Sequence, residues 1–277
     1  MARLTVHGVG IELGGRQILT GTDVEIADGS ITVLIGPNGS GKTTLLRVIG
    51  RALRATEGVV MIDGEDMVRM KPRHIATQIG TVPQGPEAPP GLTVAELVEH
   101  GRYPHLGPFG RPTTDDHEAV HWALEETGLV SLADRPIGEL SGGERQTAWI
   151  ALALAQRSNV LLLDEPTTYL DLRHQLELLD LIIRLRDEHG ITILAVLHDL
   201  NHALRVADHV VAMSNGRIDT VGSSSSVINP DCIRRVFGAE INILRDPASG
   251  HSVCVPVTTT PSQTRSPASQ VDSAGSE

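Results

Sequence analysis

Short apolar runs separated by turns cover most of the chain, with longer segments of helical character between them. Runs of β-prone residues bounded by glycine, proline, asparagine or aspartate are typical of strands. They predict strands over residues 4–7, 9–13, 23–26, 30–35, 58–64, 79–82, 160–163, 191–197, 210–213 and 217–221. The run 191–197 is β-prone throughout, as expected of a parallel strand that is buried on both faces. Strands that alternate with helices therefore indicate an α/β protein with a parallel sheet.

Two of the expected helices open on a capping box, in which a hydroxyl and an acid three residues later satisfy N–H groups at the helix start. The pairs are Thr93 with Glu96 and Ser141 with Glu144. We expect helices over residues 44–49, 94–101, 115–127, 141–155 and 173–189. Residues 27–29 and 215–216 are each expected to form a hairpin turn.

The stretch from Gly36 to Thr44 fits the phosphate-binding pattern G-x-x-x-x-G-K-[ST] and lies between an expected strand and an expected helix. Its glycines let backbone N–H groups converge on an anion, and the helix adds the positive end of its dipole. Lys42 would reach the β- and γ-phosphates, and the Thr43 hydroxyl would bind Mg²⁺. The nucleotide-binding residues assigned here are Gly36, Pro37, Asn38, Gly39, Ser40, Gly41, Lys42, Thr43 and Thr44. A glycine-rich turn without this role is the alternative.

Two acids, Asp164 and Glu165, follow directly after the apolar run 160–163. In phosphate-loop enzymes an acid at this place holds Mg²⁺, directly or through water, so Asp164 is the expected metal residue. Glu165 is then placed to orient and polarise the attacking water. An acidic strand end that merely faces solvent is the alternative.

Composition narrows the choice of partners. The net charge of −11 argues against broad nucleic-acid binding, which needs a basic surface. Aromatic residues make up only 2% of the chain, so a stacking platform for single strands is not expected. No apolar run is long enough to span a bilayer, and the first residues do not resemble a signal peptide. The two cysteines, Cys232 and Cys254, indicate neither a metal site nor a disulfide framework.

The sequence from Leu140 to Gln146, Leu-Ser-Gly-Gly-Glu-Arg-Gln, resembles the signature of ATP-binding cassette (ABC) ATPases. Ser141 can cap a helix whose first N–H groups are free, and the two glycines allow close approach to phosphate. In that family the signature binds the ATP held by a second subunit. The resemblance therefore implies a head-to-tail homodimer in which Ser141, Gly142 and Gly143 complete the partner's site.

Further positions match the family in order and spacing. Gln84 resembles the glutamine that contacts Mg²⁺, Asp171 the aspartate that communicates across the dimer, and His198 the histidine that contacts the γ-phosphate. The resemblance implies Mg-ATP as the bound species and Lys42, Glu165 and His198 as the catalytic set. The family usually has an aromatic residue against the adenine, and Leu13 aligns there.

The implied fold is a RecA-like P-loop NTPase core with an N-terminal antiparallel β portion and an inserted helical subdomain. We expect the core to comprise residues 1–84 and 158–245, the helical subdomain residues 85–157, and a disordered tail residues 246–277. Residues 101–105 and 197–203 are similar to subunits that drive uptake of iron-siderophores, haem or cobalamin. This similarity implies a peripheral ATPase on the cytoplasmic face of the membrane, bound to permease subunits and indirectly served by an extracytoplasmic substrate-binding protein.

Three other functions are considered. A soluble ABC ATPase acting on nucleic acid or ribosomes is the alternative, although the negative charge does not favour it. A nucleotide-binding regulator without turnover would not require the complete catalytic set. His117, Glu118 and His121 also fit H-E-x-x-H, a zinc-protease pattern, but no third ligand is evident.

Overall fold

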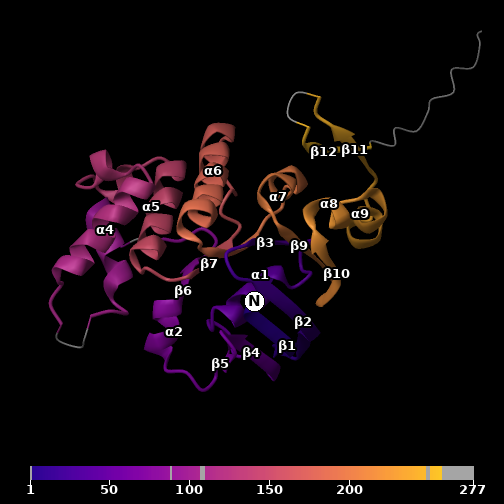
Figure 1. Cartoon of the computed structure of the whole chain (residues 1–277), viewed down its shortest axis with the longest axis horizontal. Coiled ribbons are helices and arrows are strands. Elements are labelled where there is room, and N and C mark those ends of the chain that lie inside the picture. The colour runs from indigo at the N-terminus through magenta and orange to yellow at the C-terminus, as the bar shows by residue number, and fades with distance from the viewer. Residues whose placement is uncertain (1, 88, 107–109, 248–249, 258–277) are drawn as a thin grey trace, which may run out of the picture.

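The computed structural model describes residues 2–87, 89–106, 110–247 and 250–257, which form two larger sheets, a small hairpin and flanking helices (Figure 1). The larger sheet has six strands in the order β10-β9-β3-β8-β7-β6. The strands are β3 (Ile31–Ile35), β6 (Ile79–Val82), β7 (Val160–Asp164), β8 (Thr192–Val196), β9 (His209–Ser214) and β10 (Arg217–Ser223). The pairs from β9 to β6 are parallel, and β10 is antiparallel to β9.

The central strands β3, β7 and β8 are buried along their whole length. Successive side chains point to opposite faces of a strand, so each strand contributes to two cores. Leu161 and Leu163 pack with the helical side, whereas Leu162 packs with α1 (Lys42–Ile49) and the antiparallel sheet. This arrangement explains why these segments read as uninterrupted apolar runs.

The antiparallel sheet covers the α1 side of the large sheet and has the order β2-β1-β4-β5. Its strands are β1 (Ala2–Leu13), β2 (Arg16–Ala27), β4 (Glu57–Ile62) and β5 (Glu65–Asp66). β1 covers two of the expected strands, residues 4–7 and 9–13. Between them the pairing register shifts from Val6 to Val9, and Gly8 has a positive φ of 57° there. An irregularity of this kind lets the strand continue past the break in the apolar pattern. Residues 27–29 do not form the expected hairpin, since β2 and β3 belong to different sheets.

Helices α4 and α5 lie at one end of the molecule, away from the small hairpin (Figure 1). This helical portion contains α3 (Val94–Glu99), α4 (Thr114–Glu126) and α5 (Gly142–Ala155), with short 3₁₀ turns at His100–Arg102, Val130–Leu132 and Ile137–Glu139. Both expected capping boxes are present, at Thr93 and at Ser141. The remaining helices are α2 (Pro72–Gln78), α6 (Leu172–His189), α7 (Leu200–Val206), α8 (Ser224–Val227) and α9 (Pro230–Phe237).

A buried ion pair joins three elements of the helical portion. Arg102 Nε donates to Asp116 Oδ1 at 2.8 Å, and both side chains are less than one-tenth exposed. Arg102 also donates to the carbonyl of Ala155, and the second Asp116 oxygen accepts from the backbone and hydroxyl of Thr113. These hydrogen bonds, above all the one from the Thr113 backbone, lower the pKa of Asp116 to about 2.

The expectation of a disordered tail from residue 246 is wrong for part of that segment. β12 (Ser252–Pro256) pairs with β11 (Ile241–Arg245), and the Cys254 side chain is buried. The Asn201 amide donates to the Cys254 carbonyl and accepts from the Cys254 N–H, at 3.2 and 2.7 Å. The few apolar residues of β12 lie among polar ones and were too weak a pattern to predict a strand. This strand forms because it pairs with distant residues. The expectation for residues 258–277 falls outside the described residues.

None of the helices in the described part of the chain is long and apolar enough to cross a membrane. Both cysteines are free thiols and are buried.

The Asp116 carboxylate is expected to stabilise the fold in a pH-dependent way. Its pKa is lower in the folded chain, about 2, than the ordinary value of 3.8, so its stabilisation is present above that ordinary value and lost as pH falls through 2. Asp116→Asn should lower the free energy of unfolding by about 1–2 kcal/mol at pH 7, measured by urea denaturation. The difference from the wild type should shrink between pH 4 and pH 2. The exposed Glu125→Gln serves as the control, and a pH-independent difference would contradict the assignment.

Candidate active site

The phosphate-loop segment joins β3 to α1 and is shaped by glycines with positive φ angles, which disfavour a side chain. Gly36 has a φ of 151°, and a Cβ there would lie 2.2 Å from the carbonyl oxygen of Met213 on β9. Gly41 has a φ of 102° and lies against the Leu19 side chain of β2. The loop is therefore held between both sheets, and several of its residues line a cavity.

Lys42 is buried in this loop. Its ammonium group donates to the carbonyls of Gly36 and Pro37, at 2.7 and 3.0 Å. Burial lowers the pKa of Lys42, while the nearby carboxylates of Glu165 and Asp164 act in the opposite direction. The positive charge of Lys42 is thus held at the loop, where it can bind anionic oxygens.

Thr43 and Asp164 meet although 121 residues separate them in the sequence. The Thr43 hydroxyl donates to Asp164 Oδ1 at 2.9 Å. Among the described residues, nothing donates to the buried Asp164 Oδ2, and burial raises the pKa of this carboxyl group. A hydroxyl beside a buried carboxylate with an unpaired oxygen is a hard oxygen donor set. These two residues therefore fit the requirements of Mg²⁺.

Glu165 follows at the end of β7 and is the centre of a polar cluster. Its Oε1 lies 2.5 Å from His198 Nε2, and its Oε2 accepts from the Gln84 side-chain amide at 2.6 Å. Its backbone adopts a left-handed conformation, with a φ of 52°, which is costly for a residue with a side chain. The structure thus brings together the three residues that follow β6, β7 and β8.

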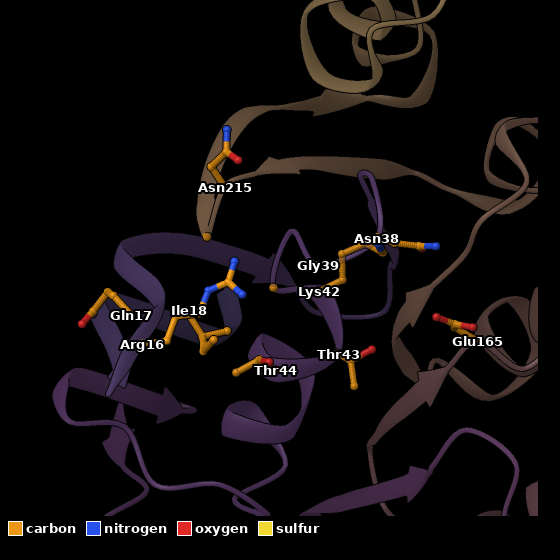
Figure 2. Close-up of a pocket in the computed structure, with 12 residues that line it drawn as sticks. Arg16, Gln17, Ile18, Asn38, Gly39, Lys42, Thr43, Thr44, Glu165 and Asn215 are labelled. Carbon is orange, nitrogen blue, oxygen red and sulfur yellow. The ribbon is translucent and has the colours of Figure 1, made fainter. Parts of the chain in front are cut away.

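A cavity of about 440 Å³ opens beside the loop (Figure 2). It is lined by Arg16, Gln17, Ile18, Asn38, Gly39, Gly41, Lys42, Thr43, Thr44, Glu165, Asn215 and Gly216. Leu13, assigned to the base by alignment, is exposed and is not among these residues. Arg16, Ile18 and Asn215 were not assigned from the sequence, because their place depends on how β2 meets the β9–β10 turn. Of these features, the sequence predicted only the turn at residues 215–216.

The signature residues and Asp171 lie elsewhere in the same chain. Ser141 caps α5 and its hydroxyl accepts from the Glu144 N–H, while Gly142 is exposed. Asp171 caps α6, and its carboxylate lies 2.8 Å from His174 Nδ1. None of Ser141, Gly142, Gly143 and Asp171 lines the cavity at the phosphate loop. Gly142 instead borders a second cavity, of about 270 Å³, together with Gln84 and Glu165.

The H-E-x-x-H match on α4 has no metal-site geometry. His117, Glu118 and His121 are all exposed, and His121 is paired with Glu125 at 3.1 Å. In the described part of the chain, no group of three or more histidine, cysteine or acidic side chains could hold a metal ion. The protease alternative therefore has no structural support.

A phosphate loop at the carboxyl end of a parallel strand, with a buried acid and a second carboxylate beside it, defines a P-loop nucleoside triphosphatase. The sequence model of the ABC transporter family matches residues 19–168, which is more than half of the chain. The chain belongs to that family and is an ABC-type ATPase that binds ATP.

Two relatives with assigned roles match over nearly their whole lengths. The iron(3+)-hydroxamate import ATP-binding protein FhuC of Bacillus subtilis is 47% identical, over 92% of this chain and 95% of that protein. The ferric enterobactin transport ATP-binding protein FepC of Escherichia coli is 42% identical, over 93% and 95%.

Solved structures agree with this assignment. A metal-chelate type ABC transporter in an inward-facing conformation superposes with a TM-score of 0.82 at 26% identity, covering 94% of this chain and 99% of that one. The dimeric bacterial ABC transporter cassette MJ0796 superposes with a TM-score of 0.70 at 27% identity, covering 80% and 98%. The fold expected from the sequence is thereby confirmed.

Removing the buried cation should disable the loop. Lys42→Ala is expected to reduce ATP binding or turnover by about 100-fold, because it removes the cation that the loop holds for the phosphates. Titration calorimetry and phosphate release measure the two quantities. Lys71→Ala is the matched control, since Lys71 is exposed before α2 and does not line the cavity. Unchanged binding and turnover in Lys42→Ala would refute the assignment.

Proposed function

We propose that this protein is the ATPase subunit of a membrane importer that takes up an iron-siderophore or a related metal chelate, such as haem or cobalamin. The observation that carries the proposal is the high identity to FhuC and FepC along almost the whole chain, together with an intact catalytic set. The superposition with a metal-chelate type transporter supports the same cargo class. The relatives favour this role over action on nucleic acid or ribosomes, and so does the net charge of −11.

Hydrolysis would proceed by attack of water on the γ-phosphate, with charge developing on phosphate oxygens that the loop N–H groups and Lys42 stabilise. Glu165 would orient and polarise the water, and His198 would contact the γ-phosphate from the neighbouring strand end. Thr43, Asp164 and Gln84 would hold Mg²⁺, which supplies charge neutralisation between the phosphates when bound.

The second half of the site would come from another copy of the chain. Ser141, Gly142 and Gly143 lie away from the phosphate-loop cavity, and the N-terminus of α5 has free N–H groups that suit an anion. The dimeric cassette MJ0796 supports pairing of such units. We place Asp171 at the dimer contact, because it starts α6 beside Tyr169, which is almost fully exposed.

Coupling to transport would pass through the boundary between the core, residues 1–84 and 158–245, and the helical subdomain, residues 85–157. Gln84 stands at this boundary and already contacts Glu165. Permease subunits bound there would hold the ATPase on the cytoplasmic face of the membrane. An extracytoplasmic substrate-binding protein would deliver the chelate to the permease.

Replacing the water-orienting carboxylate should separate binding from turnover. Glu165→Gln keeps the size and hydrogen-bonding capacity of the side chain but loses its negative charge, so hydrolysis should fall by about 100-fold. ATP binding should persist, and size-exclusion chromatography with light scattering should detect an ATP-dependent dimer. Glu177→Gln, an exposed carboxylate paired with Arg173, is the control. Rapid turnover without an ATP-induced dimer would contradict the role.

The cargo is tested with the whole transporter. The membrane protein that co-purifies with this chain should be reconstituted in vesicles with its binding protein, and uptake of labelled ferric hydroxamate, ferric catecholate, haem and cobalamin compared. ATP-dependent uptake of one chelate supports the proposal. Co-purification with RNA or ribosomes in place of a membrane protein would overturn it.

A further inference from the structure

The cavity beside the phosphate loop has two chemically different ends (Figure 2). Lys42, Thr43 and Glu165 mark the end that receives the phosphates and the metal. Arg16 and Asn215 lie towards the opposite end. A nucleotide whose phosphates occupy the loop must therefore direct its base towards Arg16 and Asn215.

This far end is fixed by the backbone rather than by mobile side chains. The Gly216 carbonyl accepts from Thr20 N–H at 3.0 Å, and Gly216 N–H donates to the Ser40 carbonyl at 3.1 Å. A Cβ at Gly216 would lie 2.2 Å from the carbonyl oxygen of Ile18, so the β9–β10 turn is pressed against β2. The start of β2, which carries Arg16, is thus held at a fixed distance from the phosphate loop.

The chemistry of this end is cationic and not aromatic. Of the described residues that line the cavity, none is aromatic, and Leu13 is not among them. The Arg16 guanidinium faces the cavity in Figure 2. Arg16 is exposed, and among the described residues its side chain has no hydrogen-bond or ion-pair partner, so the guanidinium is available to a ligand.

We propose that Arg16 is the base-binding residue of this ATPase and that its guanidinium packs on the purine ring. This goes beyond the proposed transport role and depends only on nucleotide binding at the phosphate loop. A guanidinium is planar and weakly hydrated, so it stacks on a flat π-system and donates hydrogen bonds from its edge.

The proposal has a consequence for base selectivity. Stacking on a guanidinium does not distinguish adenine from guanine, because both bases offer it a flat π-face. GTP is therefore expected to bind about as tightly as ATP. The substrate class of the site is purine nucleoside triphosphates in general.

Titration calorimetry on the full chain tests this, in EDTA so that turnover is arrested, with ATP, GTP and inorganic tripolyphosphate as the three probes. Tripolyphosphate occupies the loop without a base and so separates base binding from simple attraction of charge. Arg16→Ala is expected to weaken ATP and GTP binding by about threefold to tenfold and to leave tripolyphosphate binding within about twofold. Arg16→Lys, which keeps the charge but not the planar face, should weaken ATP and GTP as Arg16→Ala does.

Arg54→Ala is the matched control, because Arg54 is also exposed and lies outside the cavity. An equal loss for all three probes would overturn the proposal, since Arg16 would then act only as a charge on the phosphates. Unchanged affinity in Arg16→Ala would also overturn it. So would a preference of the wild type for ATP over GTP of more than about tenfold.

Discussion

The parallel pairing of β8 with both β3 and β7 is the constraint on which the site depends. Leu34 of β3 and Asp164 of β7 both lie opposite Val196, so the three strands end at the same level. Backbone hydrogen bonds continue past the strand ends, from Glu165 N–H to Val196 and from Leu197 N–H to Leu34. The phosphate loop, the two acids and His198 meet because their strands are in register, and a slip of one residue would separate them.

The same edge concentrates charges that would be unfavourable in isolation. Burial lowers the pKa of Lys42 and raises that of Asp164, so each group has lost hydration. Their opposite charges partly compensate, and the Thr43 hydroxyl stabilises one Asp164 oxygen. In the proposed function, a polyanion with its cation would restore what burial removed, since phosphate oxygens would face Lys42 and a metal ion would face Asp164. The fold thus holds a partly desolvated site that a nucleotide completes.

Much of this architecture could be predicted from the sequence, because its strongest signals are local. The buried strands of the parallel sheet and both capping boxes are determined by nearby residues, and they were confirmed. The segment assigned as the phosphate loop lies between a strand and a helix, as expected. Features set by distant partners were missed. α2 and β12 have weak patterns of their own, and the passage from β2 to β3 resembles a hairpin turn although the two strands lie in different sheets. Arg16 was missed for the same reason, since only the contact between β2 and the β9–β10 turn places it at the cavity.

The β11–β12 hairpin sets a limit on how far the chain can be truncated at its C-terminal end without loss of structure. A chain cut after Arg245, where the sequence pattern fades, would lose the strand that covers Ile241 and would leave Asn201 without its two backbone partners. Because Asn201 lies three residues after His198, the loss would loosen the support of the active site as well as the outer core. Fusion partners and affinity tags should therefore be attached beyond Pro256.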